Sequence, residues 1–506
     1  MKPGQPYTKP RVYWLVLALA VVPAIVKWLC YPGNLGSDDA YIHLQIAHNF
    51  ASGLGWGINP GQPVNLSTSP AFTLLVVAVE RAAPQHVVAL TQILSASAVV
   101  LGLVLIFATL LAETGSIGAA LLAEAAAAFS VNLWRWNGSV MEATFAFAVV
   151  ATTLYLNRRD APKSAWRFLA LGVILGCAVL LRPEMGLVAV LTLFVQWRRA
   201  DKSIRFRITV LMVLGTAAIF LPWCLFAIKT FGSLVPTTFA AKSTSQLHLF
   251  NLVILRQMAA TLVESILFPT VLIIFILFAS RIGRSEDRRG ANPLVYAVPV
   301  GWVVGLIGFY YLKTPELQSP GRYVLPLLPA EAMIIGLLWA SLEDRVRAWQ
   351  RQFAVILMAA HAVFAVALNF KLVMPVLQRF EGEYGATMRA AANALAELTE
   401  GKPNRRVLVE EDIGVLGYEA RGRFEIFDGG ALATPSLRGL GVADQMAQVQ
   451  PAYVLQSLSR TREGLGPEFP KQLSQVWERR FRQHGVGGGS LYEYAIIFGY
   501  RKAAKE

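Results

Sequence analysis

Long apolar runs recur along most of the chain. A helix needs about 20 apolar residues to cross the hydrocarbon core of a bilayer. We expect eleven such runs to form membrane-spanning helices, at 12–30, 86–112, 116–131, 139–156, 166–181, 183–197, 208–228, 260–280, 293–312, 323–341 and 352–372. The apolar stretch 70–82 is too short to span. We expect it to lie along the membrane surface or to prolong the second helix beyond Pro84.

The pattern changes after Lys371, where ordinary charged residues return. Residues 384–400 have the periodicity of a helix, and four short apolar runs have the length and composition of strands, at 406–410, 424–428, 453–455 and 492–500. Alternating helix and strand patterns predict an α/β domain. We therefore divide the chain into a membrane module, 1–375, which contains a long outer loop at 31–85, and a soluble α/β domain, 376–506.

Composition supports a membrane protein and excludes several other classes. Hydrophobic residues make up 55% of the chain, charged residues 15%, and the mean hydropathy is +0.49. A soluble protein has about 25% charged residues, so a water-soluble globule, a disordered chain and a fibrous repeat are all excluded. The three cysteines, Cys30, Cys177 and Cys224, form no metal-binding motif and no disulfide framework.

The distribution of basic residues predicts the orientation. The formal net charge is +14. If the N-terminus is cytoplasmic, the inner loops carry 18 Lys and Arg residues and the outer loops carry 8. Because cytoplasmic loops are enriched in Lys and Arg, this asymmetry places the soluble domain outside the membrane. The excess charge then serves topology, and we expect no nucleic-acid partner. We also expect the first apolar run to be a retained helix rather than a signal peptide.

Two adjacent carboxylates, Asp38 and Asp39, follow the first predicted span. Charges beside a bilayer are costly unless they are solvated, paired, metal-bound or functional. A second explanation is structural, since Ser37 suits the cap of a helix whose first turn favours acidic residues. Both explanations stay open on the sequence alone.

Further polar motifs lie on the predicted outer side. After the acidic pair come Gly53-Leu54-Gly55-Trp56-Gly57 and Asn65-Leu66-Ser67-Thr68-Ser69-Pro70. Later motifs are 136–143 with Glu142, Leu181-Arg182-Pro183-Glu184, 231–238 with Lys242, and Gly321-Arg322-Tyr323. Two more, at 411–418 and 427–430, lie in the C-terminal domain.

In this order, the motifs resemble those of the GT-C membrane glycosyltransferases, and most closely the bacterial terminal β-(1→2) arabinofuranosyltransferase-like branch. Ala143, Thr237 and Gly430-Ala431 depart from that pattern. The resemblance implies a GT-C fold and a single-displacement, inverting transfer of a sugar from a polyprenyl phosphate. The best single prediction for the sugar is arabinofuranose. The implied acceptor is a cell-envelope glycan, a lipid-linked glycan or a surface protein, and the implied location is the bacterial inner membrane.

The resemblance also implies roles for individual residues. Asp38, the first of the pair, is the expected general base, and Asp39 orients the acceptor or helps to bind a metal. Arg182, Lys242 and Arg322 are the expected partners of the donor phosphate, while Tyr41, His43, Glu142 and Glu184 support the acceptor or the sugar. The resemblance fixes no cofactor and leaves a divalent cation open, since some GT-C enzymes use one. Asp38, Asp39 and Glu142 are the candidate ligands for such a cation.

Alternatives remain for these residues and for the whole chain. For each of the three cationic residues, Arg182, Lys242 and Arg322, the alternative role is to anchor the protein to lipid headgroups. Arg182 has a further alternative, an ion pair with Glu184 or Glu142. The main rival function is a flippase or transporter of lipid-linked sugars. Transporters often show inverted repeats and broken helices at the midplane, and neither is found in this sequence. A membrane ligase or polymerase would share the donor but typically depends on His or Arg residues in a large loop. The C-terminal domain also suits a scaffold for a partner protein.

Overall fold

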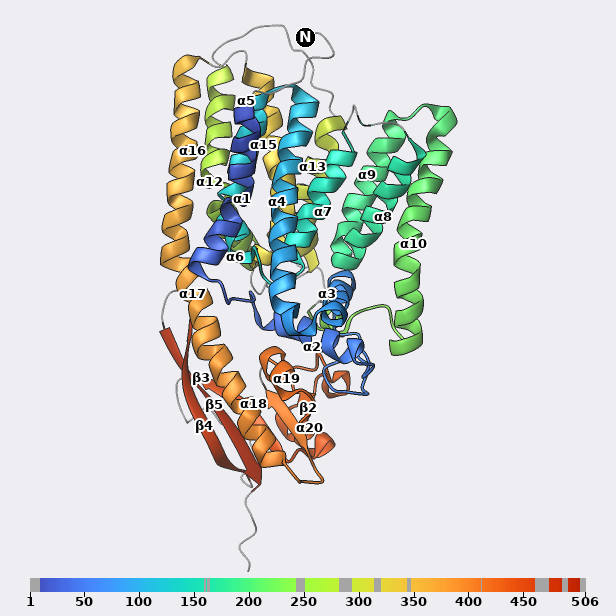
Figure 1. Cartoon of the computed structure of the whole chain (residues 1–506), viewed down its shortest axis with the longest axis vertical. Coiled ribbons are helices and arrows are strands. Elements are labelled where there is room, and N and C mark those ends of the chain that lie inside the picture. The colour runs from blue at the N-terminus through green and yellow to red at the C-terminus, as the bar shows by residue number, and fades with distance from the viewer. Residues whose placement is uncertain are drawn as a thin grey trace, which may run out of the picture.

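The computed structural model describes residues 10–158, 161, 164–242, 251–281, 294–313, 320–343, 347–410, 412–459, 473–484 and 490–500. In this part of the chain, a bundle of helices is joined at one end to a small domain built on a β-sheet (Figure 1). We call the small domain the tail domain.

All eleven predicted runs are helical over most of their length. The corresponding helices are α1 (Pro10–Cys30), α4 (Val87–Thr114), α5 (Ile117–Ala128), α7 (Ala143–Leu156), α8 (Ala165–Leu181), α9 (Gly186–Arg199), α10 (Arg205–Phe231), α12 (Leu252–Arg281), α13 (Leu294–Lys313), α15 (Leu328–Leu342) and α16 (Ala348–Leu368). Among the described residues, six helical stretches are long and apolar enough to cross a membrane, and four shorter apolar helices accompany them. The chain is therefore a multi-pass membrane protein.

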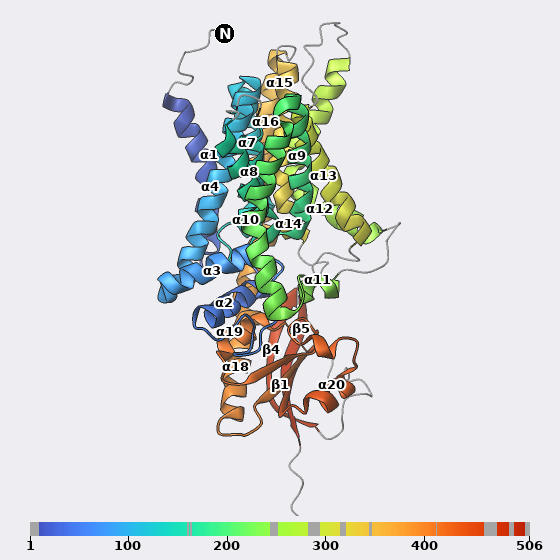
Figure 2. The same cartoon turned by 90° about the vertical axis from the view of Figure 1, so that its right-hand side faces the viewer.

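Five short helices lie near the end of the bundle that faces the tail domain (Figures 1 and 2). They are α2 (Asp38–Ala51), α3 (Pro70–Ala82), α6 (Val131–Trp136), α11 (Thr237–Lys242) and α14 (Pro320–Val324). The stretch 70–82 is thus a helix of its own. Ala83 precedes a proline, which disfavours helical backbone, and its φ of −154° separates α3 from the turn Pro84–His86 that leads into α4.

One continuous helical segment leads from the bundle into the tail domain. It runs from α16 through a π-helical turn, Asn369–Val373, then α17 (Met374–Arg379) and a second π-helical turn, Phe380–Gly385, into α18 (Ala386–Thr399). The predicted boundary at residue 375 lies within this segment and stays a prediction. The π-helix is rare and often marks functional sites; here the second π turn carries Glu381, which contacts the outer loop.

The tail domain is built on a five-stranded sheet with the order β2-β1-β3-β5-β4. The strands are β1 (Arg406–Glu410), β2 (Glu425–Asp428), β3 (Tyr453–Ser459), β4 (Leu473–His484) and β5 (Ser490–Tyr500). Strands β2, β1 and β3 are parallel, and β5 pairs antiparallel with both β3 and β4.

Helices cover both faces of this sheet. Val407 and Val409 of β1 share a core with Leu395 of α18, whereas Leu408 packs on the opposite face with Met446 of α20 (Val442–Val449). Side chains alternate between the faces of a strand, so a strand buried on both faces reads as a continuous apolar run. The predicted α/β fold of this domain is confirmed.

Candidate functional site

The first turn of α2 carries the acidic pair. Ser37 occupies the N-cap position with extended backbone, but its side chain makes no capping hydrogen bond. Its hydroxyl instead lies 3.6 Å from the sulfur of Met141. The acidic pair therefore begins a helix, as the structural explanation predicts, without the expected hydroxyl cap.

The two adjacent carboxylates lie in different environments. Asp38 is 7% exposed, whereas the side chain of Asp39 is 38% exposed. The Oδ2 atom of Asp38 accepts the backbone N–H of Gly414 at 2.6 Å, and its Oδ1 atom accepts that of Val415 at 2.9 Å. Burial and the nearby Asp412 raise the pKa of Asp38 well above its usual range, against the opposing effect of these two hydrogen bonds.

Asp39 forms an ion pair with Arg322, one of the predicted phosphate ligands. The Nη1 atom of Arg322 donates to Asp39 Oδ2 at 2.6 Å, and its Nη2 atom donates to the hydroxyl of Tyr323 at 3.0 Å. The guanidinium group is buried, but Asp39 borders solvent. The site thus combines an accessible carboxylate with a buried cation.

Arg182 is held by protein groups on all sides. Its Nε donates to Glu184 Oε1 at 2.7 Å, its Nη2 to the hydroxyl of Tyr310 at 2.9 Å, and its Nη1 to the backbone oxygen of Arg322 at 3.0 Å. Tyr310 also donates to Glu184. This set matches the alternative in which Arg182 pairs with an acidic neighbour.

Glu142 joins the two arginines. Its Oε1 atom lies 3.6 Å from Arg182 Nη1 and 3.7 Å from Arg322 Nε. Both guanidinium groups also lie about 5 Å from the ring centroid of Tyr323 (4.8 and 4.9 Å). We call Asp39, Glu142, Arg182, Glu184 and Arg322 the charged cluster. The side chain of Lys242, the third predicted phosphate ligand, lies outside the described residues.

Tyr41 and His43 lie next to the acidic pair but have different partners. Tyr41 donates its hydroxyl to Glu381 at 2.9 Å, and so faces the tail domain. His43 is buried, with Nδ1 2.8 Å from the hydroxyl of Thr73 on α3 and its ring edge-on to Phe72. Burial lowers the pKa of His43, which keeps the imidazole neutral.

Two motifs that are far apart in the sequence, 65–70 and 231–238, meet through hydrogen bonds. Asn65 donates to the backbone oxygen of Ser233 at 3.2 Å, and the N–H of Thr237 donates to the backbone oxygen of Asn65 at 2.8 Å. The hydroxyl of Thr237 then reaches the tail domain, donating to the oxygen of Leu432 at 2.6 Å. Thr237, which departs from the motif of the resembled family, therefore joins the outer loop to the tail domain.

The outer loop also covers part of the edge strand β2 of the tail sheet. Asn59 donates to the backbone oxygen of Ile426 at 2.8 Å and accepts its N–H at 2.9 Å, so one side chain satisfies both backbone groups of an edge residue. Unpartnered strand edges are open to unwanted pairing. This contact both protects β2 and binds the tail domain to the loop.

We expect Asn59→Ala to weaken docking of the tail domain by about 1–3 kcal/mol, since both groups of Ile426 lose their partner. Hydrogen exchange at the Ile426 amide should speed up in proportion. Gln62→Ala is the comparison variant: Gln62 accepts a hydrogen bond from the Asn59 side chain at 3.1 Å and contacts Glu425 in an exposed position, so it should speed up exchange at Ile426 less than Asn59→Ala does. Unchanged exchange at Ile426 would show that Asn59 does not hold the tail domain.

Several members of the site carry no signal in the sequence that would have predicted them. Tyr310 lies within an apolar span and carries no polar pattern, and Glu381 lies in a helical linker with ordinary charges. Tyr323 belongs to the quoted Gly-Arg-Tyr motif but received no role. Gly414 lies in a quoted tail motif, yet nothing local connects that motif to Asp38.

The candidate metal ligands do not form a metal site in this arrangement. Both oxygens of Asp38 accept backbone N–H groups, and Glu142 lies between two arginines. In the described ranges, no three His, Cys, Asp or Glu side chains gather in a way that would hold a metal ion.

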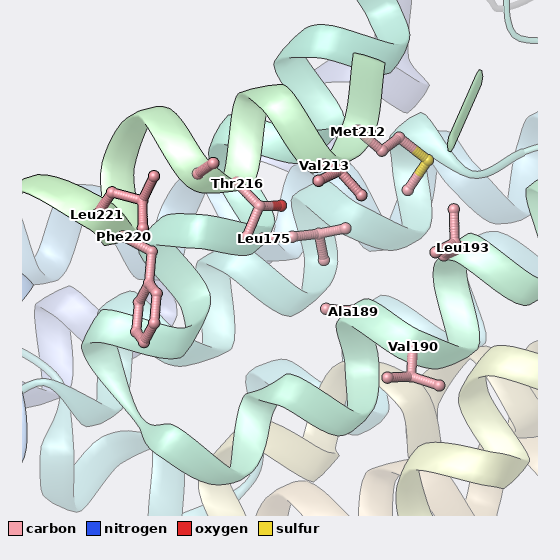
Figure 3. Close-up of a pocket in the computed structure, with 10 residues that line it drawn as sticks. Leu175, Ala189, Val190, Leu193, Met212, Val213, Thr216, Phe220 and Leu221 are labelled. Atoms are coloured by element: carbon pink, nitrogen blue, oxygen red, sulfur yellow. The ribbon is translucent and has the colours of Figure 1, made fainter. Parts of the chain in front are cut away.

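A separate apolar cavity of about 320 Å³ lies between α8, α9 and α10. Figure 3 shows aliphatic side chains such as Leu175 and Leu193 around it. Its polar member is Thr216, whose hydroxyl donates to the backbone oxygen of Gly172 at 3.0 Å. None of the residues lining the cavity is ionisable, so it supplies no catalytic group.

Three solved structures have a similar overall fold over most of the length of this chain. ArnT from Cupriavidus metallidurans bound to undecaprenyl phosphate matches with a TM-score of 0.59 at 15% identity, covering 97% of this chain and 98% of that one. The Archaeoglobus fulgidus oligosaccharyltransferase in complex with Zn and sulfate has a TM-score of 0.52 at 13% identity, covering 87% and 67%. Arabinofuranosyltransferase AftD from mycobacteria has a TM-score of 0.54 at 16% identity, covering 98% of this chain and 40% of AftD.

Comparisons with protein-family models and with curated protein sequences find no match. At this level of identity, the structural likenesses establish the fold alone. They confirm the predicted polytopic GT-C fold with its C-terminal α/β domain, while the arabinofuranosyltransferase-like branch stays a prediction.

Proposed function

We propose that this chain is an inverting glycosyltransferase that moves a sugar, with arabinofuranose as the best candidate, from a polyprenyl phosphate to a hydroxyl of a cell-envelope glycan, a lipid-linked glycan or a surface protein. The observation that carries the proposal is the solvent-bordering Asp39 paired with the buried Arg322. This pair lies at the tail-facing end of a GT-C bundle whose relative ArnT was solved with undecaprenyl phosphate.

Asp39 is the proposed general base. The acceptor oxygen attacks the anomeric carbon, the bond from that carbon to the phosphate oxygen breaks, and the acceptor proton passes to the carboxylate. The leaving phosphate monoester needs little protonation, so one base suffices. A base must come within about 3 Å of the proton it removes. Asp39 is accessible to an acceptor, whereas Asp38, favoured by the family pattern, is buried with both oxygens accepting N–H groups.

Arg322 is the proposed ligand of the donor phosphate. Arg forms two parallel hydrogen bonds with a phosphate, and the Asp39 carboxylate occupies the same guanidinium group in this structure. A bound phosphate therefore competes with Asp39 for Arg322. Donor binding would release the base at the moment when it is needed. Arg182 holds the cluster together, and Lys242 remains a further candidate for the phosphate.

The proposed side of the reaction is the outer face of the bacterial inner membrane. In support, α16, whose first residues belong to the predicted inner loop 342–351, begins at the end of the bundle remote from the tail domain and runs toward α17 (Figure 1). An outward-facing tail domain agrees with the positive-inside rule.

The test uses purified protein in nanodiscs, with labelled polyprenylphosphoryl arabinofuranose and an envelope glycan fraction. We expect labelled glycan with the wild type and a rate of labelling about 10²–10⁴-fold lower with Asp39→Asn. Saturable donor binding without transfer by the wild type would contradict the proposal and would favour a flippase. Absence of donor binding would exclude arabinofuranose as the sugar.

We expect Arg322→Lys to raise the donor KM about tenfold, which corresponds to about 1.4 kcal/mol. Lys supplies one point charge and cannot replace a bidentate guanidinium contact. Initial rates at varied donor concentration measure this effect. Arg405→Lys, at an exposed position of the tail domain, is the control. Equal KM values for the two variants would exclude Arg322 as the phosphate ligand.

A further inference from the structure

We propose that the tail domain completes the catalytic site: the backbone amides of Gly414 and Val415 hold the Asp38 carboxylate and so fix the first turn of α2, which carries Asp39. Asp38 is then a positioning residue. This inference rests on the proposed function, and it assigns to the tail domain a task in the transfer step itself rather than a scaffolding role.

The contact between Asp38 and the tail domain is close and specific. Both carboxylate oxygens are used, at 2.6 Å to the N–H of Gly414 and at 2.9 Å to the N–H of Val415. A Cβ atom on Gly414 would lie 2.1 Å from the backbone oxygen of Asp38 and 2.4 Å from its Oδ2. The approach therefore requires glycine at position 414, in a segment that is 376 residues away from Asp38 in the sequence.

The position of this contact makes it relevant to catalysis. Asp38 and Asp39 are consecutive residues of one helical turn, so their side chains point about 100° apart around the helix axis. When the tail domain fixes the direction of Asp38, it also fixes the direction in which Asp39 leaves the helix. That direction leads to Arg322, at 2.6 Å.

Two further contacts hold the same short segment against the tail-side linker. Glu381, in the second π-helical turn, accepts the N–H of Leu35 at 3.3 Å and the hydroxyl of Tyr41 at 2.9 Å. The ring of Tyr41 also lies 5.8 Å from that of Tyr418 in α19 (Gly414–Ala420). The chain is thus bound on both sides of the acidic pair.

The experiment compares Gly414→Ala with Gly382→Ala in full-length protein in nanodiscs. A Cβ on Gly382 would meet no atom within 4 Å, so this variant is the matched control. Two quantities are measured: hydrogen exchange of the backbone amides of 412–418, and kcat and donor KM with polyprenylphosphoryl arabinofuranose. A misplacement of about 1 Å at a reacting group costs roughly 10²-fold in rate. We expect faster exchange and a loss of kcat of about that size in Gly414→Ala, with donor KM within about twofold of the control.

Gly414→Ala leaves the contacts of Arg322 with Glu142 and Tyr323 in place, so donor binding, and with it the donor KM, should change little. A loss of kcat at nearly constant donor KM therefore distinguishes positioning of Asp39 from a merely structural contact. Faster exchange with a control-like kcat would overturn the inference, and so would unchanged exchange at Gly414 and Val415.

Should Gly414→Ala fail to fold, Asp38→Asn decides by the same two measurements, since an Asn amide turns one acceptor into a donor against an N–H group. Failure of the wild type to transfer sugar would instead overturn the proposed function, and this inference with it.

Discussion

Asp39→Asn is expected to lower kcat by a factor of about 10²–10⁴, the usual contribution of a positioned general base. Asn has nearly the same shape as Asp but cannot accept the proton of the acceptor hydroxyl. The donor KM should stay equal or fall, because the neutral amide no longer competes with the phosphate for Arg322. Steady-state rates at saturating acceptor and varied donor measure both quantities.

Asp38→Asn is the informative comparison for this result. It should lower kcat as well, but through the tail domain, and hydrogen exchange at Gly414 and Val415 should speed up in that variant only. A different pattern would reassign the base. If Asp39→Asn keeps its rate while Asp38→Asn loses it with the tail domain still docked, the first carboxylate of the pair accepts the proton, as the family pattern implies.

The fold was largely predictable because its largest elements follow from simple patterns. Each apolar run of sufficient length is a helix, and strand β1 matches the predicted run 406–410. Strand β4 was not predicted, because residues such as Glu478 and Arg479 interrupt its apolar pattern. An antiparallel strand at the edge of a sheet needs only one apolar face, which is a weak signal in sequence.

The candidate site was predicted as a set of residues but not as a set of roles. Asp38 and Asp39 are chemically identical neighbours, and only their burial and their partners in the folded chain separate them. That burial depends on Gly414, whose distance along the chain hides the contact from any local pattern. The membership of Arg182, Arg322 and Glu142 in one cluster is a tertiary property of the same kind.

Arg182→Gln is expected to destabilise the folded protein by about 3–5 kcal/mol, the usual effect of removing one member of a buried ion pair. Arg182 is 4% exposed and lies against Glu184, Glu142 and Tyr310. Gln is too short and carries no charge, so two buried carboxylates lose a cationic partner. The midpoint of thermal unfolding in detergent should fall well below that of the exposed control Arg405→Gln.

A double-mutant cycle between Arg182 and Glu184 tests the same interaction. Arg182→Leu combined with Glu184→Leu should be less harmful than the sum of the two single variants, with a coupling of about 0.5–3 kcal/mol, because the double variant leaves neither charge of that pair buried alone. If Arg182→Gln instead melts like the control and loses only donor affinity, Arg182 is a ligand of the phosphate rather than a support for the cluster. The donor would then be bound by two arginines that share Glu142, and binding would have to break the contacts of Arg182 with Glu184 and Tyr310 as well as the pair between Asp39 and Arg322.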